Sequence, residues 1–288
     1  MPPLTFALLG LAAIAVWGAA ASSGRWRGWP WRLLLLASCL RALAEGFMDW
    51  RALPVAVGLW VTAELYHRAS DRRRRWAWGG AALLLAATLA THRLPGFAPF
   101  LVAEGLHLSP ASAEMSLKAH FDKAFAGVLL LACFCAHARD LADWRRALDV
   151  GLTVGAVTAV IVVGLAVAAG AVRFDPKLPA ITAAWMAANL LLTCVFEEAL
   201  FRGVIQDRLA RLVKDRRRLT WLPLVAASLL FGFAHAGGGP VLIVVAMIAG
   251  VGYGVAYAIT GRVEAAIVAH FTLNSIHFLG FTYPYAVR

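Results

Sequence analysis

The stretch Val195–Gly203, "VFEEALFRG", places two adjacent glutamates and an arginine inside a run of apolar residues. The flanking sequence is rich in Leu, Ala and Val and is long enough to cross a lipid bilayer. An ionised side chain at membrane depth carries a large free-energy cost and marks a functional site by default. The chemistry of this protein is therefore expected to centre on this stretch.

The composition indicates a membrane protein. The chain has 288 residues, of which 61% are hydrophobic and only 15% are charged. The apolar residues fall in many separate runs, as in a polytopic membrane protein. The predicted fold class is all-α, a polytopic bundle of eight to ten transmembrane helices.

Eight runs are long enough to span a bilayer with allowance for tilt. Two weaker candidates, at 33–49 and 53–67, are shorter or are interrupted by Arg41, Glu45 and Glu64. With these two included, ten helices are the favoured number. The eight stronger runs lie at 3–23, 76–91, 121–137, 148–172, 180–202, 219–236, 240–260 and 263–283.

The basic residues predict an orientation. With the N-terminus outside, most of the 27 Lys and Arg residues fall on the inner side, as the positive-inside rule requires. Two basic clusters, 24–32 and 68–78, are mixed with tryptophan, a pattern that also occurs in single-stranded nucleic-acid binding. Their position beside apolar runs favours the headgroup layer instead. We expect the lipid bilayer as partner, no nucleic acid, and multi-pass insertion in a bacterial inner membrane.

Two regions are expected along the chain. Residues 1–147 form an N-terminal transmembrane region without a recognisable motif, and residues 148–288 form the catalytic transmembrane domain. The longest connection, 92–120, would lie outside and could cover a site or admit a substrate. The four cysteines lie in apolar runs without ligand spacing and are interpreted as small buried hydrophobes.

Helical spacing divides the roles of the two glutamates. Residues four apart share a helix face, so Glu198 and Arg202 can pair, while Glu197 points elsewhere. A carboxylate removed from water without a close cation holds its proton more tightly, which suits proton transfer near neutral pH. Glu197 is therefore the candidate base, and Glu198 with Arg202 the candidate supporting pair.

Two further clusters lie in the same half of the chain: His235 in "FGFAH" and His270 with Asn274 in "HFTLN". His270 and Asn274 are four apart, so their side chains share a face and both could donate to a developing oxyanion. Each group alone is more often a packing hydrogen bond between helices. Packing alone explains poorly why two glutamates, two histidines and an asparagine occur together in these apolar helices.

Other catalytic signatures are absent from the sequence: HExxH, GxGD and GxSG, which mark other proteases, and the nucleotide-binding P-loop. The three strings present are Glu197–Arg202 as EExxxR, Phe231–His235 as FxxxH, and His270–Asn274 as HxxxN. Together and in this order they resemble the CPBP family of CAAX-protease and bacteriocin-processing intramembrane endopeptidases, also called the Abi family. The resemblance covers roughly 180–280. Outside it, Asp122 and Lys123 stand at a helix entrance and merit attention.

The resemblance implies an all-helical membrane endopeptidase acting near the terminus of a membrane-anchored peptide or protein. Glu197 would activate water with help from His235, and His270 and Asn274 would stabilise the oxyanion. Glu198, Arg202 and Phe231 would support them. Eukaryotic relatives trim prenylated CAAX tails, whereas a bacterial chain is expected to mature a bacteriocin or peptide, or to remove a C-terminal sorting tail.

Three alternatives stay open. The family has also been described as metalloproteases, so Glu197, His235 and His270 could instead hold a zinc ion. No cofactor is favoured, because no ligand pair shares one helix at i,i+3 or i,i+4 spacing. From other classes, the chain could be a proton-coupled transporter or a non-catalytic immunity or scaffold protein.

One tension remains in the predicted topology. Glu197 and His270 fall toward the inner side of their helices, while His235 falls near the outer end of its own. A kink at Pro223, a re-entrant segment at 236–240, or a helix longer than 180–202 would bring them together.

Overall fold

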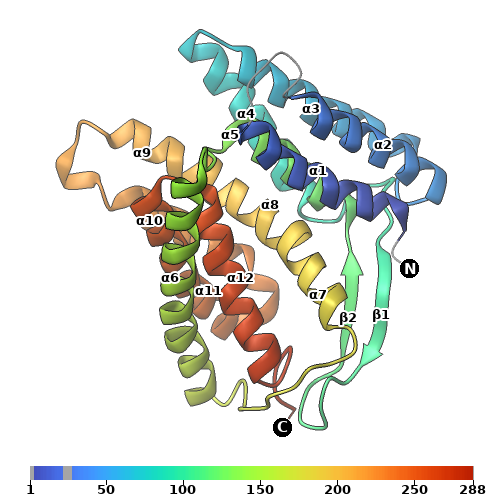
Figure 1. Ribbon diagram of the computed structural model, residues 1–288, viewed down its shortest axis with the longest axis vertical. Helices are drawn as coiled ribbons and strands as arrows, with labels where there is room; N and C mark the ends of the chain where they lie inside the picture. Colours follow the sequence, from blue (N-terminus) through green and yellow to red (C-terminus); the bar gives the residue numbers. More distant parts are fainter. Residues whose placement is uncertain (1–2, 22–27, 288) are drawn as a thin grey trace.

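The protein is a helical bundle with one short β-hairpin, seen in a computed structural model that describes residues 3–21 and 28–287 (Figure 1). Part of the basic cluster at 24–32 therefore lies outside the described residues. The first group of helices comprises α1 (Leu4–Ala21), α2 (Trp29–Glu45), α3 (Leu53–Arg68) and α4 (Arg72–Leu89). The hairpin follows, with antiparallel strands β1 (Phe100–Leu106) and β2 (Met115–Ala119).

The second half is built around one long helix that carries the two glutamates. This glutamate helix runs over Thr182–Val213. It consists of α7 (Thr182–Ala188), a π-helical segment (Asn189–Cys194), α8 (Val195–Glu198), a second π-helical segment (Ala199–Gln206) and α9 (Asp207–Val213). The remaining helices are α5 (Phe121–Phe134), α6 (Leu141–Ala168), α10 (Leu222–Ala234), α11 (Gly239–Thr260) and α12 (Val263–Gly280).

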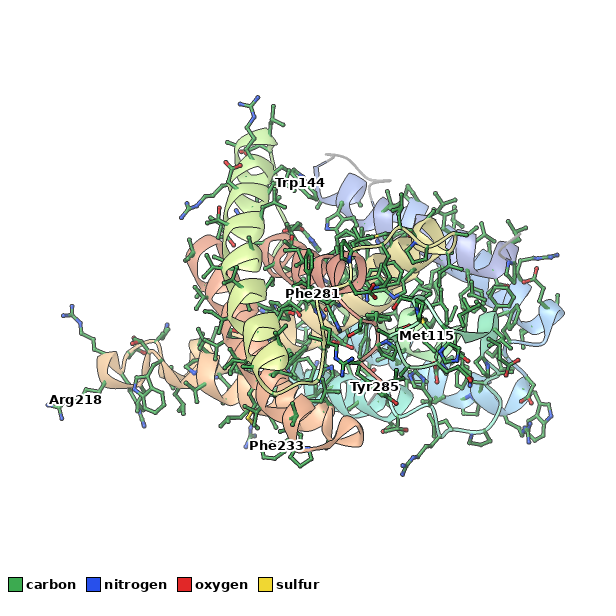
Figure 2. The ribbon with its side chains drawn as sticks, turned by 90° about the horizontal axis from the view of Figure 1, so that it is seen from below. Met115, Trp144, Arg218, Phe233, Phe281 and Tyr285 are labelled. Carbon is green, nitrogen blue, oxygen red and sulfur yellow. The ribbon has the colours of Figure 1, made fainter. Side chains whose placement is uncertain are left out.

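The helices form two groups with the glutamate helix between them. In Figure 1, α1 to α4 (blue to cyan) lie at the upper right, and α6, α11 and α12 lie at the lower left. The α9 end of the glutamate helix and the connection after it extend away from the bundle, with Arg218 at the tip (Figure 2). The all-α prediction is confirmed, and each of the ten predicted runs contains a helix.

The boundaries differ in ways that matter for the site. The run predicted at 180–202 continues to Val213, because Arg208 and Arg211 extend the helix beyond its apolar part. Pro223 stands in the first turn of α10, where its missing N–H costs nothing, so it produces no kink. The predicted boundary at 147/148 falls inside α6. The 92–120 connection contains the β-hairpin, which is not among the predicted elements.

Three described helices are long and apolar enough to cross a membrane by length and composition. They are Leu141–Ala168, Thr182–Val213 and Ala236–Thr260. Shorter or more polar helices, such as the 13-residue α10, make up the other predicted spans. The figure of eight to ten membrane helices thus stays a prediction, whereas an apolar helical bundle is observed.

Helix α5 is the central buried helix of the fold. All of its residues except Lys123 and Ala132 are buried, and it packs against both α1 and α3 on one side and α8 on the other. A helix that is hydrophobic all round is stable only inside a protein or a membrane. At Gly127 a Cβ would lie 3.1 Å from Phe196 Cα, so the missing side chain lets α5 approach α8 closely.

A buried carboxylate anchors α12 at its first turn. Glu264 is 2% exposed and accepts hydrogen bonds from Trp17 Nε1 at 2.9 Å and from the backbone N–H of Ala138 at 3.2 Å. His137 Nδ1 lies 3.0 Å from the same carboxylate. These contacts join α1 and the α5–α6 connection to α12, which fixes the helix that carries His270.

Two glycines allow α6 to pack against α12. A Cβ at Gly151 would lie 2.8 Å from the carbonyl oxygen of Ala265, and a Cβ at Gly155 would lie 2.8 Å from that of Ala269. Ala269 is adjacent to His270. Small residues at such a contact let helix backbones approach closely, which is a common basis of helix association in membranes.

We expect Gly155→Ala to destabilise the protein by about 1–3 kcal/mol, because the new methyl group meets backbone atoms that cannot move aside. Gly164→Ala, on the same helix, is the matched control, since a Cβ there meets nothing within 4 Å. Thermal unfolding of both variants in detergent measures the difference. Equal melting temperatures for the two would contradict close packing at Gly155.

Candidate active site

Glu197 lies at the centre of a cluster of polar side chains buried in the bundle. Its side chain is 10% exposed. One carboxylate oxygen, Oε1, accepts a hydrogen bond from Lys123 Nζ at 2.7 Å. The other, Oε2, is buried and has no hydrogen-bond partner within the described structure. A buried acceptor without a partner is unusual in a folded protein and calls for a functional explanation.

Two imidazoles face the free oxygen of Glu197. His235 Nε2 and His270 Nε2 each lie 4.0 Å from Glu197 Oε2. A gap of this length is too long for a direct hydrogen bond, and a water molecule beside the three groups could hydrogen-bond to more than one of them. The structure therefore brings together three of the predicted site residues around one carboxylate oxygen.

Glu198 holds the second imidazole in place. Its carboxylate is fully buried and accepts from Arg202 Nε at 2.9 Å through Oε2, and its Oε1 lies 2.8 Å from His270 Nδ1. A carboxylate can only accept, so His270 donates its Nδ1–H to Glu198 and turns Nε2 toward Glu197. The predicted Glu198–Arg202 pair is observed, and its contact with His270 is additional.

His235 is oriented by the backbone of its own helix. It follows the last residue of α10, and its Nδ1 lies 2.8 Å from the carbonyl oxygen of Phe231. A carbonyl oxygen accepts, so Nδ1 carries the proton and Nε2 faces Glu197. The Phe231 ring lies 4.7 Å from the His235 ring and 5.7 Å from the His270 ring, centroid to centroid. Phe231 therefore forms a wall shared by both histidines.

The predicted topological tension is resolved by the long glutamate helix. Because this helix continues to Val213, Glu197 lies near its middle and not at its inner end. His235 stands at the end of the short helix α10, where the chain turns before α11. The end of α10 thus reaches the middle of the glutamate helix. The greater length of the glutamate helix places Glu197 at the level of His235.

Asn274 lies one turn beyond His270 on α12. Its Nδ2 donates to Asn189 Oδ1 at 3.2 Å, and no hydrogen bond joins it to Glu197 in the part of the chain that the structure describes. The same nitrogen lies 4.0 Å from Cys194 Sγ, a weak acceptor for its second N–H group. The structure places Asn274 beside the site and not in contact with the Glu197 carboxylate.

One expectation about Glu197 is wrong. Its own helix offers no close cation for its charge, but Lys123 of α5 supplies one at 2.7 Å. Lys123 stands 74 positions earlier in the chain, and no local pattern predicts such a contact. The polar pair Asp122–Lys123 at a helix entrance was the available signal.

Tyr253 of α11 is a second residue that sequence reasoning missed. Its ring stacks on that of His270, with centroids 4.5 Å apart and planes 12° apart. A tyrosine in an apolar helix carries no distinctive pattern, so the sequence offered no signal for it. Stacking on one side and Glu198 on the other leave His270 little rotational freedom.

The fold and the site together define a helical membrane protein with a buried glutamate–histidine centre. Residues 177–276 match the family described as Type II CAAX prenyl endopeptidase Rce1-like. This segment contains all three motifs, and the match confirms the predicted resemblance. The matched family is one of endopeptidases, as its description states. Neither the curated proteins nor the solved structures compared contain a significant match.

Breaking the Glu198–Arg202 pair should destabilise the protein strongly. Arg202→Met keeps much of the side-chain volume but leaves the fully buried Glu198 without its cation, and we expect a loss of about 3–5 kcal/mol. The control is Arg211→Met, which removes another i,i+4 pair, with Asp207, from a side chain that is 69% exposed. Thermal unfolding in detergent compares them, and equal small effects would argue against a structural role for the buried pair.

Proposed function

We propose that the protein is an intramembrane endopeptidase that hydrolyses a peptide bond near the terminus of a membrane-anchored protein or peptide. The observation that carries this proposal is the free Oε2 of Glu197, a buried acceptor facing two imidazoles at 4.0 Å. The family match supports a protease of this general type. A multi-pass position in a bacterial inner membrane is part of the proposal.

In the proposed mechanism, Glu197 acts as general base. Its Oε2 takes one proton from a water molecule held near His235, and the water oxygen attacks the carbonyl carbon of the scissile bond. The carbonyl oxygen becomes an oxyanion. Collapse of this tetrahedral intermediate breaks the C–N bond, and the proton on Glu197 passes to the leaving nitrogen, which restores the carboxylate.

His270 and Asn274 are proposed to stabilise the oxyanion. Because Glu198 accepts from Nδ1, His270 can donate from Nε2 only in its imidazolium form. Donors placed at developing negative charge lower the barrier in a site that excludes water. Asn274 would contribute the amide N–H that does not donate to Asn189, in place of its weak contact with Cys194 Sγ.

The positions of the possible ligand atoms argue against zinc at Glu197, His235 and His270. Within residues 3–21 and 28–287, only His92, His120 and Asp122 bring three metal-ligating atoms within 4.8 Å of one another. Glu197, His235 and His270 do not form such a set. In addition, the Lys123 ammonium lies against the Glu197 carboxylate and would repel a divalent cation there. We therefore propose the metal-free, glutamate-dependent mechanism.

Glu197→Gln tests the proposal directly. The amide keeps the shape of the side chain but cannot take a proton, so we expect cleavage to fall by a factor of about 10³ with the melting temperature little changed. Comparative peptidomics of cells with the wild-type and Glu197→Gln chains, with and without chelator, measures the loss and identifies the product. Full activity of the variant would overturn the mechanism. Proton flux through liposomes containing an inactive variant would favour the transporter alternative.

Lys123 is expected to be a positioning residue for Glu197. Without its ammonium group, the Glu197 carboxylate loses the hydrogen bond at Oε1 that fixes the direction of Oε2. We expect Lys123→Gln to lower cleavage by at least about tenfold, while Lys123→Arg retains part of the activity. Lys118→Gln, at an exposed position of β2, should have no effect. Equal activity of the two glutamine variants, once the product is known, would argue against this role.

A further inference from the structure

A second polar cluster lies at the entrance of α5, outside the segment that matches the family. It consists of His92, which follows α4, His120, which caps α5, and Asp122 in the first turn of α5. One ligand atom from each residue lies within 4.8 Å of the other two. From this geometry we propose that His92, His120 and Asp122 form a binding site for a divalent transition-metal ion of the zinc type.

The donor set has the chemistry that zinc prefers. Two imidazole nitrogens and one carboxylate oxygen suit Zn²⁺ and related ions, whereas Mg²⁺ and Ca²⁺ favour oxygen ligands alone. Donor atoms around a tetrahedral zinc ion lie roughly 3.3 Å apart, given bonds of about 2.0 Å. His92 Nδ1 already lies 3.0 Å from both Asp122 oxygens, so His120 is the ligand that has to move closer.

A simple ion pair accounts for only part of the cluster. The His92–Asp122 contact explains two residues, but the His120 ring stacks on that of His92 with centroids 3.8 Å apart. Within the described structure no side chain hydrogen-bonds to the His120 imidazole. Two adjacent imidazoles repel each other when both are protonated, whereas a metal ion binds both in the neutral form. A metal ion shared with His92 and Asp122 would therefore explain the position of His120.

The backbone at His92 supports a functional role. Its φ is 56°, and it is the only residue other than glycine with positive φ in the described chain. Such a conformation costs free energy in a residue with a Cβ and is commonly retained at ligand sites. In this conformation the His92 Nδ1 lies 3.0 Å from the Asp122 carboxylate.

The exposure of the cluster provides an entry path for the ion. The Asp122 side chain is only 3% exposed, while that of His92 is 31% exposed. The carboxylate thus lies at the base of the site and His92 at its solvent side. Three protein ligands leave a fourth coordination position for water.

The site adjoins the proposed protease centre through one residue. Asp122 precedes Lys123, whose ammonium group contacts Glu197. An ion held by His92, His120 and Asp122 would tie the end of α4 to the first turn of α5 and fix the backbone from which Lys123 extends. This coupling to cleavage rests on the proposed function, whereas metal binding itself does not.

The test is metal binding to the full-length protein in detergent. After removal of metal with a chelator, Zn²⁺ binding is measured by equilibrium dialysis and Co²⁺ binding by its visible absorption. We expect one equivalent in this site, at least about a tenfold rise in Kd for His120→Ala and for Asp122→Asn, and a Zn²⁺-dependent rise in melting temperature that both variants lose. His67→Ala, which removes an exposed histidine elsewhere, should bind as the wild type does.

Glu197→Gln separates the two centres. We expect this variant to bind Zn²⁺ with wild-type affinity at the His92 cluster, even if the proposed protease mechanism fails. Loss of the bound ion in Glu197→Gln, with normal binding by His120→Ala, would assign the metal to the Glu197 centre and overturn the proposal. Absence of binding in the wild type would also overturn it. If Asp122→Asn does not fold without metal, His120→Ala alone decides, because its ring makes no hydrogen bond to a side chain.

Discussion

The site depends on the buried carboxylate of Glu198. This one group accepts from Arg202 on its own helix and from His270 on α12, and so it joins two helices at the depth where the site lies. A buried charge is stable only when it is paired and its lone pairs are satisfied, which both partners achieve here. Orientation of the His270 imidazole, and with it the environment of Glu197, follows from this pairing. Glu198, which does not face the proposed reaction, thus fixes the position of His270, which does.

The N-terminal region takes part in the same centre, although no family motif lies in it. Helix α5 reaches α8 because Gly127 has no side chain, and Lys123, one turn earlier on the same face, meets Glu197. Glu264 ties α1 and the α5–α6 connection to α12. The two predicted regions are therefore joined at the site by a lysine on one side and by a buried carboxylate on the other.

Local periodicity predicted what depends on residues close in sequence. The apolar runs located the helices, and the spacing of Glu198 and Arg202 predicted their pair, because both follow from the pitch of a helix. The Lys123–Glu197 contact, the stacking of Tyr253 on His270 and the β-hairpin depend on long-range packing, which one sequence does not encode in a readable pattern. The helix end at Val213 was missed because charged residues after 202 resemble a loop when only hydropathy is considered.

The π-helical segments on either side of Glu197 and Glu198 affect how related sequences should be compared. Each π turn contains one residue more than an α turn, so deleting a single residue from Asn189–Cys194 could restore a regular helix. Because a wide π turn accommodates its extra residue locally, the faces of Asn189 and Glu197 would stay close to their present alignment in such a chain. A related chain can therefore lack one residue between Asn189 and Glu197 and still hold the EExxxR, FxxxH and HxxxN strings in the same arrangement. A single-residue gap at this point of a sequence comparison is compatible with an intact site.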